Sequence, residues 1–191
     1  FKMPPRKYLN SLIFFSLSMG VMVYVFMNLS LYYSSIISPI ILGSQLAIPF
    51  GILASSFLLK EHISINKWLL IFTSFLGILI IFFDPKLANN YIGLFFASLM
   101  ALFFGLAQVY SRQLKELDIS MINASTGLFG FLILITISSL IEGNTLISIK
   151  SIEVESWLLI FYQAIIVSLC AHLLMFYLYK FYTVGKIFPF Y

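Results

Sequence analysis

Residues 8–59 read YLNSLIFFSLSMGVMVYVFMNLSLYYSSIISPIILGSQLAIPFGILASSFLL, and no charged side chain lies between Lys7 and Lys60. A bilayer core of about 30 Å needs about 20 apolar residues in a helix, so this run is long enough for two membrane-spanning helices. A serine-rich stretch that ends at Pro39 is typical of a turn and divides the run. We therefore predict two spans here, at 9–32 and 37–59.

The remainder of the chain has the same character. Of its 191 residues, 61% are hydrophobic and 9% are charged, whereas soluble domains have about 45–50% and about 25%. So few charges cannot cover the surface of a soluble protein of this size. The composition therefore excludes a cytosolic enzyme and a disordered segment, and it predicts an all-α, polytopic membrane helix bundle. The net charge of +4 does not indicate a nucleic-acid partner, because the basic residues punctuate apolar runs and form no basic face.

Charged residues delimit four further spans, at 68–83, 91–111, 119–141 and 156–179. Six spans place alternate loops on alternate sides of the bilayer. One side carries nine of the eleven lysines and arginines, and cytoplasmic loops are enriched in these residues. We therefore predict a multi-pass membrane protein whose cytoplasmic segments are 1–8, 60–67, 112–118 and 180–191.

Small residues recur at a spacing of four in three of the spans. In lipid, such stripes mark places where two helices approach closely, because helix pairing there has no hydrophobic driving force. They predict a tightly packed bundle. The stripes are Gly43, Ala47, Gly51 and Ser55; Ala97, Ala101 and Gly105; and Gly127 and Gly130.

Pro49 lies in the middle of the span 37–59. An interior proline removes a backbone hydrogen bond and kinks the helix. Interrupted helices often form the binding sites of membrane transporters. Pro49 is therefore a candidate hinge, and a simple structural bend is the alternative.

The sequence contains no catalytic motif, so we expect neither an enzyme nor a bound metal or cofactor. The two histidines lie 110 residues apart, and every Asp and Glu falls in a predicted loop. The single cysteine, Cys170, lies within an apolar run and forms no disulfide framework.

The candidate binding groups are polar side chains at membrane depth, where an ionisable residue is a functional hypothesis by default. Neutral polar groups among aromatic walls suit a small amphipathic or zwitterionic solute. The alternative is that these groups bond to one another between helices, which stabilises by about 0.6 kcal/mol each. The candidates are Ser168, His172 and Tyr179 on one face of the last span; Tyr24, Asn28 and Tyr32 on the first; and Gln45, Gln108 and Gln163.

Three stretches together resemble the EamA-type transporters of the drug/metabolite transporter superfamily. Residues 32–85 read YYSSIISPIILGSQLAIPFGILASSFLLKEHISINKWLLIFTSFLGILIIFFDP. Residues 93–114 read GLFFASLMALFFGLAQVYSRQL, and residues 182–190 read YTVGKIFPF. The family pattern is matched at Pro49, Glu61, Trp68 and Gly77, and Gln45 resembles a glutamine of the amino-acid-metabolite exporters.

The resemblance implies ten helices in two inverted five-helix repeats. Residues 1–87 would end the first repeat, and residues 88–191 would begin the second. We accordingly expect the chain to be an internal piece of a longer protein. Its function, as the resemblance implies, would be the export of small amino-acid-like metabolites across the bacterial inner membrane by alternating access.

Alternatives remain open from the sequence. A carrier of sugar phosphates or nucleotide sugars would need basic residues inside the spans, where this chain has none. A non-transporting scaffold and a lipid-modifying membrane enzyme are further candidates. Transport is either coupled to protons through His172 or uncoupled, so that the solute flows down its own gradient. A homodimer is expected if six spans make up the whole protein.

Overall fold

The computed structural model describes residues 4–83, 90–141 and 152–190. Every regular element within these ranges is a helix, in agreement with the predicted all-α class. Five of the described helices are long and apolar enough to cross a membrane, which suggests a membrane protein. They are Arg6–Tyr32, Ile40–Leu59, Tyr91–Gln113, Ile119–Ile141 and Val154–Tyr179.

The first two predicted spans are each interrupted. The first consists of α1 (Arg6–Leu17), a π-helical segment (Ser18–Met22) and α2 (Val23–Tyr32). The second consists of α3 (Ile37–Ser44) and α4 (Ala47–Leu59).

The other predicted spans follow in order. The third is α5 (Ile65–Phe82), whose 18 residues give a length of about 27 Å at 1.5 Å per residue. Its apolar stretch, Ile65–Ile80, is shorter than the five long spans. Then come α6 (Tyr91–Gln113), α7 (Ile119–Ile141), and a last span of α9 (Val154–Tyr162), a second π-helical segment (Gln163–Ala171) and α10 (His172–Tyr179). The described chain ends with α11 (Val184–Ile187) and a 3-10 turn (Phe188–Phe190).

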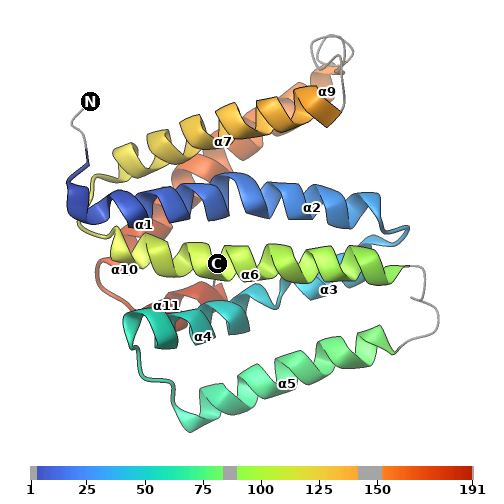
Figure 1. Ribbon diagram of the computed structural model, residues 1–191, viewed down its shortest axis with the longest axis vertical. Coiled ribbons are helices and arrows are strands. Elements are labelled where there is room, and N and C mark those ends of the chain that lie inside the picture. The colour runs from blue at the N-terminus through green and yellow to red at the C-terminus, as the bar shows by residue number, and fades with distance from the viewer. Residues whose placement is uncertain (1–3, 84–89, 142–151, 191) are drawn as a thin grey trace.

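The helices lie side by side in a layer (Figure 1). Its order is α7, α1–α2, α6, α3–α4 and α5, and the span α9–α10 crosses behind it. Helix α6 is the central element, because it contacts α1 and α2 on one side and α3 and α4 on the other. The described loops alternate between the two ends of the layer as the sequence predicted.

One end of the layer gathers the basic residues. The Tyr8 hydroxyl donates a hydrogen bond to the Glu116 carboxylate, and the Lys7 ammonium lies 5.1 Å from the centroid of the Tyr8 ring. The bond from Tyr8 and the charges of Lys7 and Lys115 lower the pKa of Glu116 below its ordinary value, against a smaller opposing effect of desolvation. These contacts join the start of α1 to the loop between α6 and α7.

The opposite end is held by Asn90, which is 3% exposed. Its Oδ1 accepts hydrogen bonds from the Ser34 hydroxyl and the Ser35 backbone N–H, both at 2.8 Å, and from the Ser35 hydroxyl at 3.1 Å. The predicted turn between the first two spans is therefore confirmed at Ser34 and Ser35, and it is tied to the start of α6.

The break between α3 and α4 follows from Pro49. Proline has no N–H, so the carbonyl of Gln45, four residues earlier, loses its α-helical donor. The N–H of Ile48 donates to this carbonyl instead, at 3.2 Å. The N–H of Leu46 similarly bonds three residues back, to the Gly43 carbonyl at 3.1 Å. The predicted kink is thus a short interruption at residues 45–46.

The small residues of the second span and α6 form a close contact, as expected of a tightly packed bundle. A Cβ on Gly105 would lie 2.6 Å from the Gly51 nitrogen and 2.9 Å from the Ala47 carbonyl oxygen. A second close contact joins the first π-helical segment to α7, where a Cβ on Gly130 would lie 2.8 Å from the Gly20 oxygen. Gly127 differs from the prediction, because nothing lies within 4 Å of its Cβ position.

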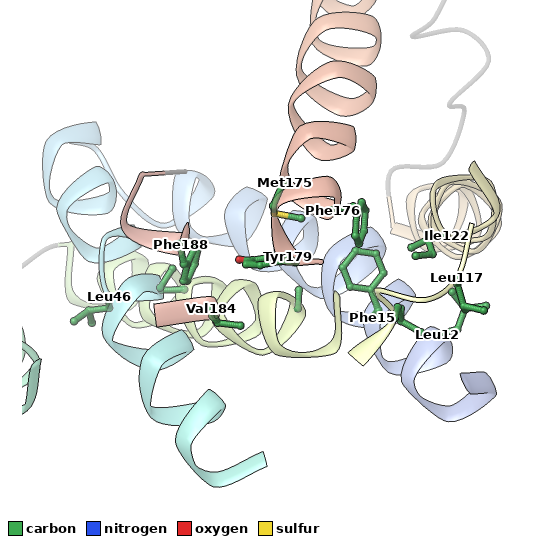
Figure 2. Close-up of a cluster of buried hydrophobic side chains, with 14 of the residues drawn as sticks. Leu12, Phe15, Leu46, Leu117, Ile122, Met175, Phe176, Tyr179, Val184 and Phe188 are labelled. Carbon is green, nitrogen blue, oxygen red and sulfur yellow. The ribbon is translucent and has the colours of Figure 1, made fainter. Parts of the chain in front are cut away.

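The last span enters the core only through α10, among the described residues. Met175, Phe176 and Tyr179 are each 2% exposed or less, whereas α9 contains no buried residue. Figure 2 shows these three side chains reaching from the end of α10 into the cluster that contains Phe15 and Phe188. The end of α10 therefore packs the last span against the rest of the bundle.

The glycine contact at Gly105 predicts a steric effect. The substitution Gly105→Ala places a methyl group against backbone atoms of α4, and we expect it to destabilise the fold by about 1–3 kcal/mol. The matched control is Gly77→Ala on α5, where nothing lies within 4 Å of the new Cβ. The control should be neutral, or stabilising by at most about 1 kcal/mol through helix propensity. Unfolding in detergent measures both, and equal stabilities would contradict the close contact.

Candidate functional site

A cavity of about 450 Å³ opens beside the break between α3 and α4, and we call it the break cavity. Its walls come from α2, the break itself, α6 and the 3-10 turn at the end of the described chain. The residues that matter for its chemistry are Val23, Ser44, Gln45, Phe104, Phe188 and Phe190.

The break cavity combines aromatic walls with neutral polar groups. The rings of Phe104 and Phe188 pack edge to face with centroids 5.5 Å apart. The Ser44 hydroxyl donates to the Ile41 carbonyl at 2.7 Å, so its donor is already used within α3. Gln45 is exposed, and its side-chain amide belongs to the cavity lining. No charged side chain belongs to the described lining.

A second cavity, of about 300 Å³, lies between the first span, α7 and the last span, and we call it the π cavity. Both π-helical segments contribute to its walls, through Met19 and Gly20 on one side and Ala164 and Leu169 on the other. Such segments are rare and often occur at functional sites. The structure brings together here two residues that the sequence singled out, Tyr24 and His172.

His172 is half-buried at the junction of the second π-helical segment and α10. Its Nδ1 lies 3.2 Å from the Val167 carbonyl oxygen, five residues earlier. In the neutral tautomer, in which Nδ1 donates this bond, Nε2 carries the lone pair. The ring is therefore oriented by the backbone of its own span.

The sequence analysis did not single out Asn123, which lines the π cavity with its neighbour Thr126. The Asn123 Nδ2 is buried and has no hydrogen-bond partner among the described residues. A signal was available, because Asn123, Thr126, Gly127 and Gly130 follow the i, i+3, i+4, i+7 spacing of one helix face. That face is small and polar within an otherwise apolar span.

Gln108 and Tyr179 line neither cavity and instead join two helices. The Tyr179 hydroxyl donates to Gln108 Oε1 at 2.9 Å, and both residues have 0% exposed surface. The guanidinium of Arg112, one turn further along α6, donates to the Tyr179 carbonyl. This geometry matches the alternative that the sequence left open for these two residues, an interhelical hydrogen bond.

The remaining candidates are dispersed. The Asn28 amide donates to the Tyr24 carbonyl at 2.8 Å, within its own helix. Tyr32 is 81% exposed, and its ring packs edge to face against Tyr33. Gln163 is exposed at the start of the second π-helical segment. The side chain of Ser168 lies outside the described part of the structure.

The described residues contain no group of three or more His, Cys, Asp or Glu side chains that could hold a metal ion. Comparison of the chain with known protein families, with curated proteins and with solved structures finds no match. The function is therefore argued from the two cavities and the helix break.

The buried pair predicts a stability effect. Tyr179→Phe leaves the buried Gln108 oxygen without its donor, and we expect it to destabilise the fold by about 1–3 kcal/mol. Adding Gln108→Leu removes the unpaired amide and should restore part of this loss. The control is Tyr177→Phe, because Tyr177 lies on the same helix and is 54% exposed. Thermal unfolding of the three variants and the unmodified protein tests the bond, and equal effects of the two tyrosine changes would contradict it.

Proposed function

We propose that this protein is an exporter of small amino-acid-like metabolites, of the EamA type, that works by alternating access in the bacterial inner membrane. The observation that supports this best is the interruption of the second span at residues 45–46, next to a cavity of about 450 Å³. Non-helical backbone within a membrane span is tolerated where it is buried in protein or lines a cavity. Interrupted helices of this kind carry the binding sites of many transporters.

The break also offers partial charges that suit a zwitterion. The carbonyl end of α3 and the N–H end of α4 meet there, and these ends carry partial negative and positive charge respectively. An ammonium group would favour the first end and a carboxylate the second. The described residues of the lining include no cationic side chain for a phosphate group, which disfavours the sugar-phosphate alternative.

The aromatic walls supply the apolar contact that such a solute needs. Phe104 and Phe188 face the cavity, and Gln45 adds one neutral amide for orientation. Alternating access would require α3 and α4 to change their relative angle, and Pro49 limits the hydrogen bonds that hold them in line. Pro49 therefore keeps the proposed role of hinge.

Coupling to protons would need a group that titrates within the membrane. His172 lines the π cavity and is the histidine within the described spans, so it is the proposed proton carrier. The ten-helix inverted repeat is part of the same proposal. In that architecture the break cavity would be completed by spans outside this chain, and in its absence by a second copy.

The orientation predicts the labelling of introduced cysteines. In a chain with Cys170→Ala, a membrane-impermeant maleimide should label Ile36→Cys in intact cells. Ile36 belongs to the turn between α2 and α3, and this turn lies at the end opposite the basic loops. Lys115→Cys should be labelled only after the membrane is opened. The reverse pattern would contradict the proposed cytoplasmic side.

The transport proposal predicts a specific loss of flux. Liposomes containing the purified protein should take up radiolabelled L-threonine or L-phenylalanine faster than empty liposomes. Gln45→Leu removes the cavity amide and should reduce this uptake about tenfold, which corresponds to about 1.4 kcal/mol of binding.

The matched control is Gln163→Leu, which makes the same change at an exposed position that lines neither cavity. Its flux should equal that of the unmodified protein. Equal losses in the two variants would remove the assignment to the break cavity, and no flux in the unmodified protein would favour a non-transporting scaffold.

A further inference from the structure

We infer that the π cavity is a second binding site, which takes an uncharged ligand with a hydrogen-bond-accepting oxygen beside an apolar group. It is separate from the break cavity, because neighbouring residues of α2 face the two spaces. Val23 lines the break cavity and Tyr24 lines the π cavity. The inference goes beyond transport and does not depend on it.

The hydrogen-bonding requirement comes from Asn123. Its buried Nδ2 has two N–H donors and no acceptor among the described residues. A buried donor without a partner is unfavourable, so a ligand oxygen that the Asn123 amide turns to meet would be stabilised. The neighbouring Thr126 hydroxyl is already committed, since it donates to the Ile122 carbonyl at 2.9 Å. Asn123 is therefore the group with unused capacity.

The requirement for an uncharged ligand comes from the other residues of the cavity wall. No Lys, Arg, Asp or Glu is among the described residues that line the cavity. Phe15, Phe131 and Leu134 supply apolar surface instead. His172, which also lines the cavity, can supply a positive charge only in its protonated form. With His172 neutral, a carboxylate or ammonium group would lose its hydration here without gaining an opposite charge, so an ionised ligand is disfavoured.

The space for the ligand is maintained by a close backbone contact. A Cβ on Gly20 would lie 2.9 Å from the Thr126 carbonyl oxygen, so the first span and α7 touch at this point. At the next residue, Gly127, the Cβ position has nothing within 4 Å, and Gly127 belongs to the cavity lining. The first span and α7 are thus held together at one point, and the open volume of the cavity lies beside this contact.

The test uses the purified chain in detergent and two probes of nearly the same shape. N-acetyl-L-phenylalaninamide is uncharged and carries carbonyl oxygens and an aromatic ring, whereas N-acetyl-L-phenylalanine is an anion at pH 7. Calorimetric titration should show binding of the amide, with the anion at least about tenfold weaker because its charge is not compensated. Equal binding of the two probes, or binding of neither, would overturn the inference.

Variants assign the binding to this cavity. Asn123→Leu keeps the approximate size of the side chain but removes the donors, and it should weaken binding of the amide about five- to tenfold. Gly127→Leu fills the open volume and should abolish binding. The matched control is Gly77→Leu on α5, where the Cβ position also has nothing within 4 Å and where neither cavity is lined.

The controls keep the outcome clear. If Asn123→Leu fails to fold, the pair of glycine variants still decides, because both add the same side chain to a helix. Gly77→Leu should bind the amide as the unmodified protein does. If Gly127→Leu also binds it normally, the site is not this cavity.

The same titration on Gln45→Leu separates this inference from the transport proposal. We expect Gln45→Leu to lose flux but to bind the amide normally. Loss of amide binding in Gln45→Leu would place the probe in the break cavity and would overturn the inference, with the transport proposal unaffected.

Discussion

The close approach of α4 and α6 at Gly51 and Gly105 is the contact on which the rest of the architecture depends. In a membrane, an apolar side chain gains little free energy when it exchanges contact with lipid tails for contact with another helix. Helices therefore associate where small residues let their backbones touch. This contact places α6 at the centre of the layer, with the first span on its other side. It also leaves room for Phe188, because ring atoms of Phe188 would lie 2.6 Å from a Cβ on Gly51. One wall of the break cavity is therefore set by the same glycine that sets the helix crossing.

The break in the second span lies directly before this contact, and the two features have separate physical causes. Pro49 removes one backbone donor, and the nearby carbonyl is satisfied by a tighter bond three residues apart. The glycines then hold α4 against α6, so the irregular backbone stays covered by protein as membrane spans require. An interruption that is fixed on one side and open to a cavity on the other can present carbonyl and N–H groups to a solute. A simple bend that faces lipid could not present these groups to a solute.

The charges of the sequence predicted the five long apolar spans and the order of the loops, and the small residues predicted close packing, because these depend on bilayer thickness and on backbone contact. Which helices the small residues join was not predicted. The sequence did not predict which polar residues share a face. Ser168 shares a face with His172 and Tyr179 only if the last span is α-helical throughout, but Gln163–Ala171 is π-helical, with bonds from i to i+5. His172 and Tyr179 lie at opposite ends of α10, so Tyr179 bonds to Gln108 inside the bundle while His172 lines a cavity. Asn123 was missed because a single amide in a long apolar span carries little weight until its neighbours at helical spacing are considered with it.

The two cavities share the first span as a common wall, and this has an energetic consequence. Val23 and Tyr24 are adjacent in α2 and face different spaces, so a shift or rotation of α2 that widens one cavity changes the wall of the other. The first π-helical segment lies just before these residues, at the contact between Gly20 and Gly130. π-Helical turns occur mostly as short bulges inside α-helices and are frequent at functional sites. Binding free energies at two sites that bias one such element are linked, and the linkage is reciprocal. A ligand in the π cavity would then change the affinity of the break cavity for solute by some factor. Solute in the break cavity would change the affinity of the π cavity for the ligand by the same factor.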